Sequence, residues 1–124
     1  MSLEIKVQKK GEGIYVFSLL GTLDSNTYGD LKLRLKPLLA PTTKALIFDF
    51  AGLNYISSMG VSVLFEAKKN IEGQGGSFLM TNLQPQIKRV FEIINALPSV
   101  RIFETLEEAD AYLTEMQKRA LEEK

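Results

Sequence analysis

The segment Ala45-Leu46-Ile47-Phe48-Asp49-Phe50 constrains the fold most, because it is a short run that is almost wholly apolar. Such a run is typical of a central strand, since alternation with polar residues is lost where both faces of a sheet are covered. Apolar residues at helical spacing flank it: Tyr28, Leu31, Leu35 and Leu38 before it, and Val61, Leu64, Phe65 and Ile71 after it. The run therefore predicts an α/β fold with helices packed on a central sheet.

The N-terminal part of the chain predicts a hairpin followed by a helix. Leu3–Gln8 alternates apolar and polar residues, and Ile14–Leu20 is a second strand-like run beyond the Gly11–Gly13 turn. Asp24 and Ser25 are candidate N-caps for the first helix, because short polar side chains satisfy the free N–H groups of a first helical turn.

Strand and helix patterns also alternate through the rest of the chain. Residues 51–56 are expected to be a connection, after which a second helix starts at Ser57 or Ser58. The later elements are a strand at Ser77–Thr81, a helix from Pro85, a strand at Val100–Phe103 and a final helix from Thr105. The order β-β-α-β-α-β-α-β-α predicts one domain over residues 1–124, with a mixed five-stranded sheet and about four helices. Its core is expected to span about residues 3–115, and residues 116–124 are expected to fray.

The final helix carries an apolar stripe that leaves two interpretations open. The stripe consists of Leu106, Ala109, Leu113, Met116 and Ala120. Its alternation of three and four residues suits packing on the chain's own sheet, and it also suits a coiled-coil seam.

The composition argues against several classes of function. With 15 basic and 15 acidic residues the formal net charge is zero, so nucleic acid is not an expected partner. The chain has no cysteine and no histidine, which removes thiolate metal sites and the commonest general base. We therefore expect no enzyme activity, no catalytic residues, no metal and no cofactor. No stretch approaches the roughly 20 apolar residues of a membrane span, so we expect a cytoplasmic protein without direct membrane insertion.

The segment Ser57-Ser58-Met59-Gly60 stands out because it opens the second helix directly after the central strand. A helix N-terminus presents unpaired N–H groups and a partial positive charge, so it accommodates a phosphate. Phosphorylation of Ser58 would add a charge of about −1.5 to −2 at one point of the surface. Two serines before a helix are also ordinary N-caps, and the residues alone leave both interpretations open.

This segment resembles the signature of the STAS domain, the fold of bacterial anti-sigma factor antagonists. In that family an apolar strand ending in aspartate leads through a loop to Asp-Ser-Ser/Thr/Ala-Gly at a helix start. Asp49 matches the strand aspartate, Ser58 falls on the phosphorylated serine and Gly60 on the glycine. Gly21-Thr22-Leu23-Asp24 is similar to the family's Gly-x-Leu/Ile-Asp. Ser57 and Met59 depart from the family pattern, which usually has an aspartate and a small residue at these positions.

The resemblance implies a partner switch. The unphosphorylated protein would bind an anti-sigma factor that is also a serine kinase, and the ATP would belong to that partner. Phosphorylation of Ser58, or alternatively Ser57, would break the complex, and a serine phosphatase would reset it. The resemblance implies partner contact by Asp24, Ser57, Ser58, Met59, Gly60 and Val61. Asp49 and Gly21 would support the structure, and we expect a monomer or weak dimer.

Two other functions remain open. The family includes binding or scaffold modules of signalling and transport assemblies without a working switch, and the altered Ser57-Ser58-Met59 segment is compatible with such a role. A serine enzyme or small-ligand carrier is the third hypothesis. It would need a lysine or carboxylate base, and no Ser-x-x-Lys occurs at this segment.

Overall fold

A five-stranded mixed sheet forms the centre of the molecule. The computed structural model describes residues 2–93 and 101–103, and beyond these residues 105, 107, 108, 111, 114 and 115. The strands are β1 (Leu3–Gly11), β2 (Ile14–Leu23), β3 (Ala45–Ile56), β4 (Ser77–Thr81) and β5 (Arg101–Phe103). Their spatial order is β1-β2-β3-β4-β5, with β1 antiparallel to β2 and the other pairs parallel. The predicted mixed five-stranded sheet is confirmed.

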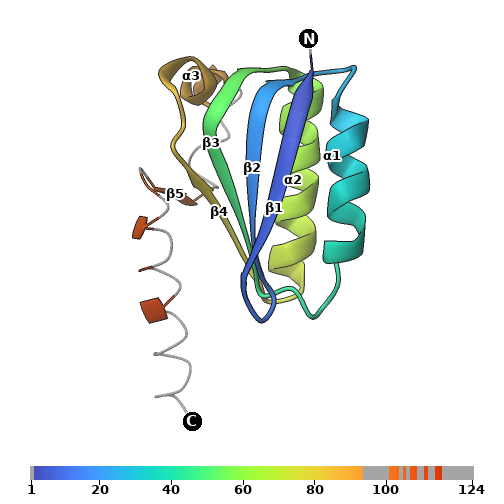
Figure 1. Ribbon diagram of the computed structural model, residues 1–124, viewed down its shortest axis with the longest axis vertical. Helices are drawn as coiled ribbons and strands as arrows, with labels where there is room; N and C mark the ends of the chain where they lie inside the picture. The colour runs from blue at the N-terminus through green and yellow to red at the C-terminus, as the bar shows by residue number, and fades with distance from the viewer. Residues whose placement is uncertain are drawn as a thin grey trace.

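Three α-helices and one 3₁₀ turn accompany the sheet within the described residues. They are α1 (Tyr28–Leu35), the 3₁₀ turn η1 (Lys36–Leu38), α2 (Ser58–Gly73) and α3 (Pro85–Ile93). Figure 1 shows α1 and α2 side by side on one face of the sheet, with α3 at the upper left, beside the upper part of β3. None of the helices in the described part of the chain is long and apolar enough to cross a membrane.

The final helix expected from Thr105 lies mostly outside the described residues, as does the segment 116–124.

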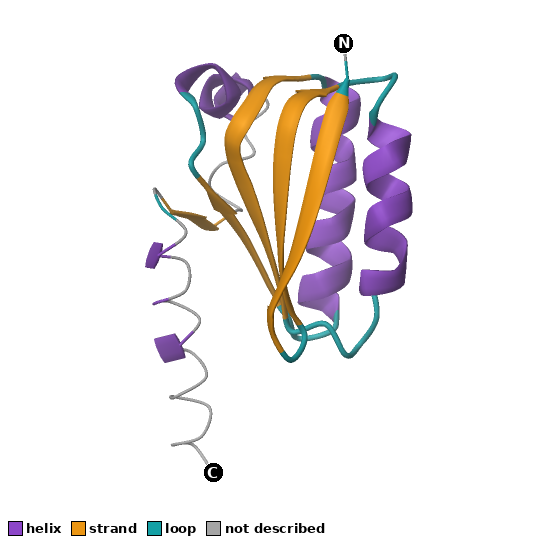
Figure 2. Cartoon of the chain, viewed as in Figure 1, coloured by secondary structure: helices purple, strands orange, loops and turns teal. Residues whose placement is uncertain are grey.

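The core fills the space between the sheet and the layer of α1 and α2 (Figure 2). On β3, Phe48 and Phe50 are fully buried on this side, and the Phe48 ring lies 5.2 Å from Phe17 and 5.3 Å from Phe78. Ile47 is also fully buried but belongs to a separate cluster on the other side of β3. Burial of one such side chain contributes about 1.5–3 kcal/mol, so the apolar run that predicted a doubly covered strand is a main source of stability.

Two strands are longer than the sequence predicted. Residues 51–56, expected to be a connection, continue β3 to Ile56, and β2 runs past Gly21 to Leu23. The two extensions pair with each other, because Thr22 is in register with Tyr55 and Leu23 with Ile56 after a register shift at Gly21. Pairing between segments distant in sequence therefore outweighs the local turn signals of the glycines.

Gly21 is required by the local backbone. Its φ is +103°, and an added Cβ would meet the carbonyl oxygen of Ser2. The same carbonyl accepts a hydrogen bond from the Thr22 N–H at 3.0 Å, which ties the start of the chain to the end of β2. A residue with a side chain would therefore be strained at position 21.

The predicted cap of the first helix is wrong. The helix α1 begins at Tyr28, and its N-cap position is Thr27 rather than Asp24 or Ser25. Asp24 instead forms a turn before the helix: its Oδ1 accepts hydrogen bonds from the N–H groups of Asn26 at 2.9 Å and Thr27 at 3.2 Å. An aspartate that bonds the backbone two residues ahead is typical of an Asx turn, which delays the start of the helix.

Candidate functional site

The candidate site lies where the carboxyl ends of β2 and β3 meet the start of α2. The Ser57 N–H donates a hydrogen bond to the Leu23 carbonyl at 2.9 Å, which joins the end of β2 to the start of α2. Asp24 directly follows Leu23, so the two sequence motifs are neighbours in the fold. In open α/β sheets, sites gather at this end of the strands.

Ser57 is the N-cap of α2. Its backbone is extended, and its Oγ accepts a hydrogen bond from the Gly60 N–H at 3.4 Å. The Ser57 side chain is half-buried and already satisfies one free N–H of the first turn. Its hydroxyl is therefore committed to the helix start.

Ser58 is the first residue of α2, and its side chain is exposed. Within the described part of the chain, the Ser58 hydroxyl makes no hydrogen bond. The positive end of the helix dipole lies at this position. A negative charge added here is stabilised by typically 0.3–1 kcal/mol, which is well under a tenfold change in an equilibrium constant. The two adjacent serines thus differ: one caps the helix, and the other is free at the surface.

Gly60 and Val61 are buried, which corrects their predicted contact with a partner. A Cβ on Gly60 would lie 2.7 Å from Leu23 Cγ and 2.9 Å from the Leu23 carbonyl oxygen. The glycine therefore allows α2 to lie close to the end of β2. Val61 is 2% exposed and belongs to the core. Gly60 and Val61 therefore pack inside the domain under the start of α2 and hold Ser58 in place. Neither is exposed enough to contact a partner directly.

Tyr55 and Met59 form the exposed apolar part of the site. Tyr55 is 54% exposed near the end of β3, and Met59 is 41% exposed in the first turn of α2. Large apolar side chains at the surface beside polar groups are typical of protein interaction sites. Tyr55 was not among the predicted contact residues, although its place beside the serines in the sequence could have suggested it. Met59 does not tuck inward, so it is available to a partner.

Asp24 is held in a fixed orientation at the edge of the site. Besides two backbone N–H groups, its Oδ1 contacts the Thr27 hydroxyl at 3.3 Å. Thr27 Oγ1 in turn accepts from the Asp24 N–H at 2.9 Å. Among the described residues, no three acidic side chains are grouped so that they could hold a metal ion.

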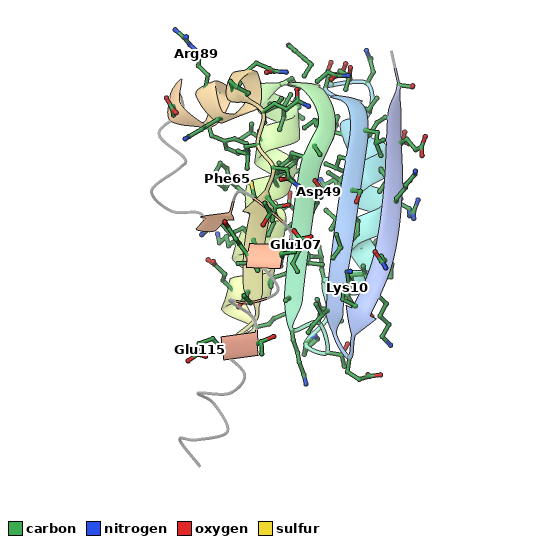
Figure 3. All side chains as sticks on the ribbon, turned by 60° about the vertical axis from the view of Figure 1, so that its left-hand side comes forward. Lys10, Asp49, Phe65, Arg89, Glu107 and Glu115 are labelled. Atoms are coloured by element: carbon green, nitrogen blue, oxygen red, sulfur yellow. The ribbon has the colours of Figure 1, made fainter. Side chains whose placement is uncertain are left out.

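Asp49, labelled in Figure 3, bonds the local backbone and the segment that follows β4. It lies within β3, and its Oδ1 accepts from the Ala51 N–H and from Asn82 Nδ2, both at 3.0 Å. Gln84 Nε2 also donates to the Ala51 carbonyl at 2.7 Å. These contacts join the segment after β4 to the extension of β3. Asn82 and Gln84 could not be found from the sequence, because they meet β3 from 33 positions away.

Comparison with known proteins finds one domain family that covers most of the chain. A model of the STAS domain matches residues 5–109. Over 102 residues the chain is 26% identical to BtrV of Bordetella bronchiseptica, which is provisionally named an anti-sigma factor antagonist. That match covers 82% of this chain and 88% of BtrV.

Two solved structures share the fold. The phosphorylated form of the Bacillus cell fate determinant SpoIIAA has a TM-score of 0.72 at 20% identity, covering 89% of this chain and 99% of SpoIIAA. A sulfate transporter family protein from Wolinella succinogenes has a TM-score of 0.74 at 19% identity, covering 90% of this chain and 93% of that protein. At such identities the likeness establishes the fold alone.

Proposed function

Because this chain belongs to the STAS domain family, we propose that it is an anti-sigma factor antagonist controlled by phosphorylation of Ser58. In this proposal the unphosphorylated chain binds an anti-sigma factor in the cytoplasm and thereby releases a sigma factor. The anti-sigma factor is also a serine kinase and supplies the ATP. The name of the relative BtrV supports the first part of this role.

The observation that carries the proposal is the exposure of Ser58 at the start of α2, where its hydroxyl bonds no other described residue. An acceptor serine must reach into the kinase's active site, and a hydroxyl that caps its own helix is less free to do so. Ser57 caps the helix through its Oγ. We therefore favour Ser58 over Ser57 as the acceptor.

The transfer step needs no catalytic group from this chain. The Ser58 Oγ attacks the γ-phosphorus of ATP held by the partner, and the bond between that phosphorus and the β,γ-bridging oxygen breaks. ADP leaves, and the serine proton passes to a base of the partner kinase. A separate serine phosphatase hydrolyses the phosphoserine with water. The chain itself is a substrate and a binding surface rather than an enzyme.

Phosphorylation weakens the complex through local charge. The phosphate appears directly beside the exposed Met59 in the chain and close to the Asp24 segment, so it must be desolvated near an apolar side chain and a carboxylate if the partner stays bound. Because a helix N-terminus tolerates the anion, the domain keeps its fold. The complex is lost while the switch module remains intact.

The second candidate is a binding module without a switch. One observation favours it: Ser57 stands at the position where the family usually has aspartate. In this case the same surface would bind its partner constantly, whatever the charge at Ser58.

Partner capture with charge variants at Ser58 tests the proposal. Tagged wild-type protein, Ser58→Ala and Ser58→Asp are each incubated with extract of the native cells, and the captured proteins are identified by mass spectrometry. We expect wild type and Ser58→Ala to retain the same ATP-binding anti-sigma factor and Ser58→Asp to retain at least about tenfold less.

Ser57→Asp is the matched control, because it places the same charge one residue away at an N-cap that favours aspartate. All variants should unfold at temperatures close to that of wild type. Equal capture by Ser58→Ala and Ser58→Asp would overturn the switch and favour the constant binding module.

A further inference from the structure

A groove between α1 and α2 lies on the helical face of the molecule, apart from the Ser58 surface. Its volume is about 590 Å³. Leu35, Val63 and Ala67 line it and are buried, whereas Leu33 stands at its edge with 70% of its surface exposed. Leu33 is the most exposed large apolar side chain among the described residues. An apolar groove beside a protruding leucine is a surface that favours a macromolecular partner.

The charges around the groove are balanced. Asp30, Lys32, Lys36 and Glu66 line it, and Lys32 Nζ lies 3.9 Å from Glu66 Oε2. Asp30 and Lys36 have no ion pair with any described residue. A groove with two charges of each sign does not favour a strongly anionic occupant. The groove instead favours a partner surface that has an acidic residue at one end and a basic residue at the other.

The chain itself has such a surface. Asp30 precedes Leu33 by three residues and Lys36 follows it by three, so they lie about 4.5 Å to either side along the helix axis. A two-fold axis at Leu33 reverses the helix direction. It therefore brings Asp30 of each copy level with Lys36 of the other. The zero net charge of the chain adds no general repulsion between copies.

We propose that the α1–α2 groove binds a second copy of this chain. The interface is isologous, with the two Leu33 side chains at its centre and two Asp30–Lys36 pairs at its edges. Leu33 supplies most of the affinity, because apolar anchors at the centre of an interface dominate binding. The charge pairs set the antiparallel register of the two helices.

Sedimentation equilibrium of the full chain tests this interface. Wild type should show a monomer–dimer equilibrium, and Leu33→Gln should weaken it at least about tenfold, as truncation of a central anchor does. Asp30→Lys and Lys36→Glu should each weaken it about fivefold, since either change turns two attractive pairs into two repulsive ones. The double variant Asp30→Lys/Lys36→Glu restores opposite charges and should return to within about twofold of wild type.

Each variant is checked for folding by its thermal unfolding temperature, since all three positions lie at the surface. A wild-type chain that stays monomeric at millimolar concentration would overturn the proposal. A double variant no better than either single variant would overturn it as well. A monomer whose groove instead binds dodecanoate, used as an apolar probe with an anionic head, would assign the groove to a small amphiphile and overturn the dimer. The dimer and the Ser58 switch are measured separately, by sedimentation and by partner capture. A negative result for one therefore does not decide the other.

Discussion

Two adjacent serines, Ser57 and Ser58, have different surroundings at the start of α2. Ser57 accepts a hydrogen bond from the Gly60 N–H, whereas the Ser58 hydroxyl faces solvent. The sequence left the choice of acceptor open, because both residues suit a helix start. The direction of each side chain at the cap distinguishes them, and that direction follows from the extended backbone of Ser57. This difference is the reason for favouring Ser58 as the phosphoacceptor.

The resemblance to the family located the segment but not the exposure of its members. Gly60 and Val61 were predicted to meet a partner, and both are buried. A helix start turns successive side chains by about 100°, so neighbours in a motif necessarily point to different surroundings. Contact roles assigned to a whole motif therefore hold for only some of its residues.

Gly60→Ala should lower the free energy of unfolding by about 1–3 kcal/mol, because its Cβ would overlap the Leu23 side chain and backbone. Chemical denaturation of the purified protein measures this loss. Gly73→Ala is the matched control, since a Cβ there meets nothing within 4 Å.

The control should leave the stability unchanged or raise it by up to about 1 kcal/mol, as Gly→Ala does at a helical position that tolerates alanine. If both variants were equally stable, the close approach of α2 to the end of β2 would not be the reason for a glycine at position 60.

At the scale of elements, the type and order of most strands and helices could be predicted, as could the bounds of β4 and the starts of α2 and α3. The ends of β2 and β3 and the start of α1 could not. The central run, the hairpin, and the helices over 58–73 and from Pro85 follow from apolar spacing and glycine or proline punctuation. The extension of β3 to Ile56 does not, because Gly52 and Asn54 have the composition of a loop. Its partner is the end of β2, and such pairing is visible only in the folded sheet.

The segment after β4 locks this extension in place. Asn82 donates to Asp49 at 3.0 Å while its own backbone has a φ of +57°, a conformation that asparagine tolerates and most residues avoid. Gln84 Nε2 donates to the Ala51 carbonyl at 2.7 Å, so the strand extension is joined to the residue directly before α3.

Replacement of Asn82 separates the side-chain contact from the backbone strain. Asn82→Ala should lose about 2–3 kcal/mol of stability, because the hydrogen bond is lost and alanine is strained at this φ. Asn82→Gly should lose about 1 kcal/mol less, since glycine accepts the conformation. Urea denaturation measures both. Equal losses would indicate that the hydrogen bond alone makes asparagine preferable here.

At the scale of the molecule, the residues that stabilise the fold are distinct from the surface that we propose to bind a partner. The core between the sheet and the helices is built from fully buried Phe and Leu side chains, and the Ser58 surface stands outside it. A charge added at the start of α2 does not enter the core, so the partner release that we propose would leave the domain folded. The groove between α1 and α2 is a second surface, with its own apolar anchor at Leu33.

Phosphopeptide mapping with intact mass measurement, on the protein purified from its native cells across several growth conditions, tests the central claim most directly. We predict a fraction of the chain heavier by one phosphate, about 80 Da, with the modification on Ser58. Phosphate on Ser57 alone would contradict the acceptor that we assign. No phosphate on either serine under any condition would contradict the switch itself and leave a domain that binds its partner constantly.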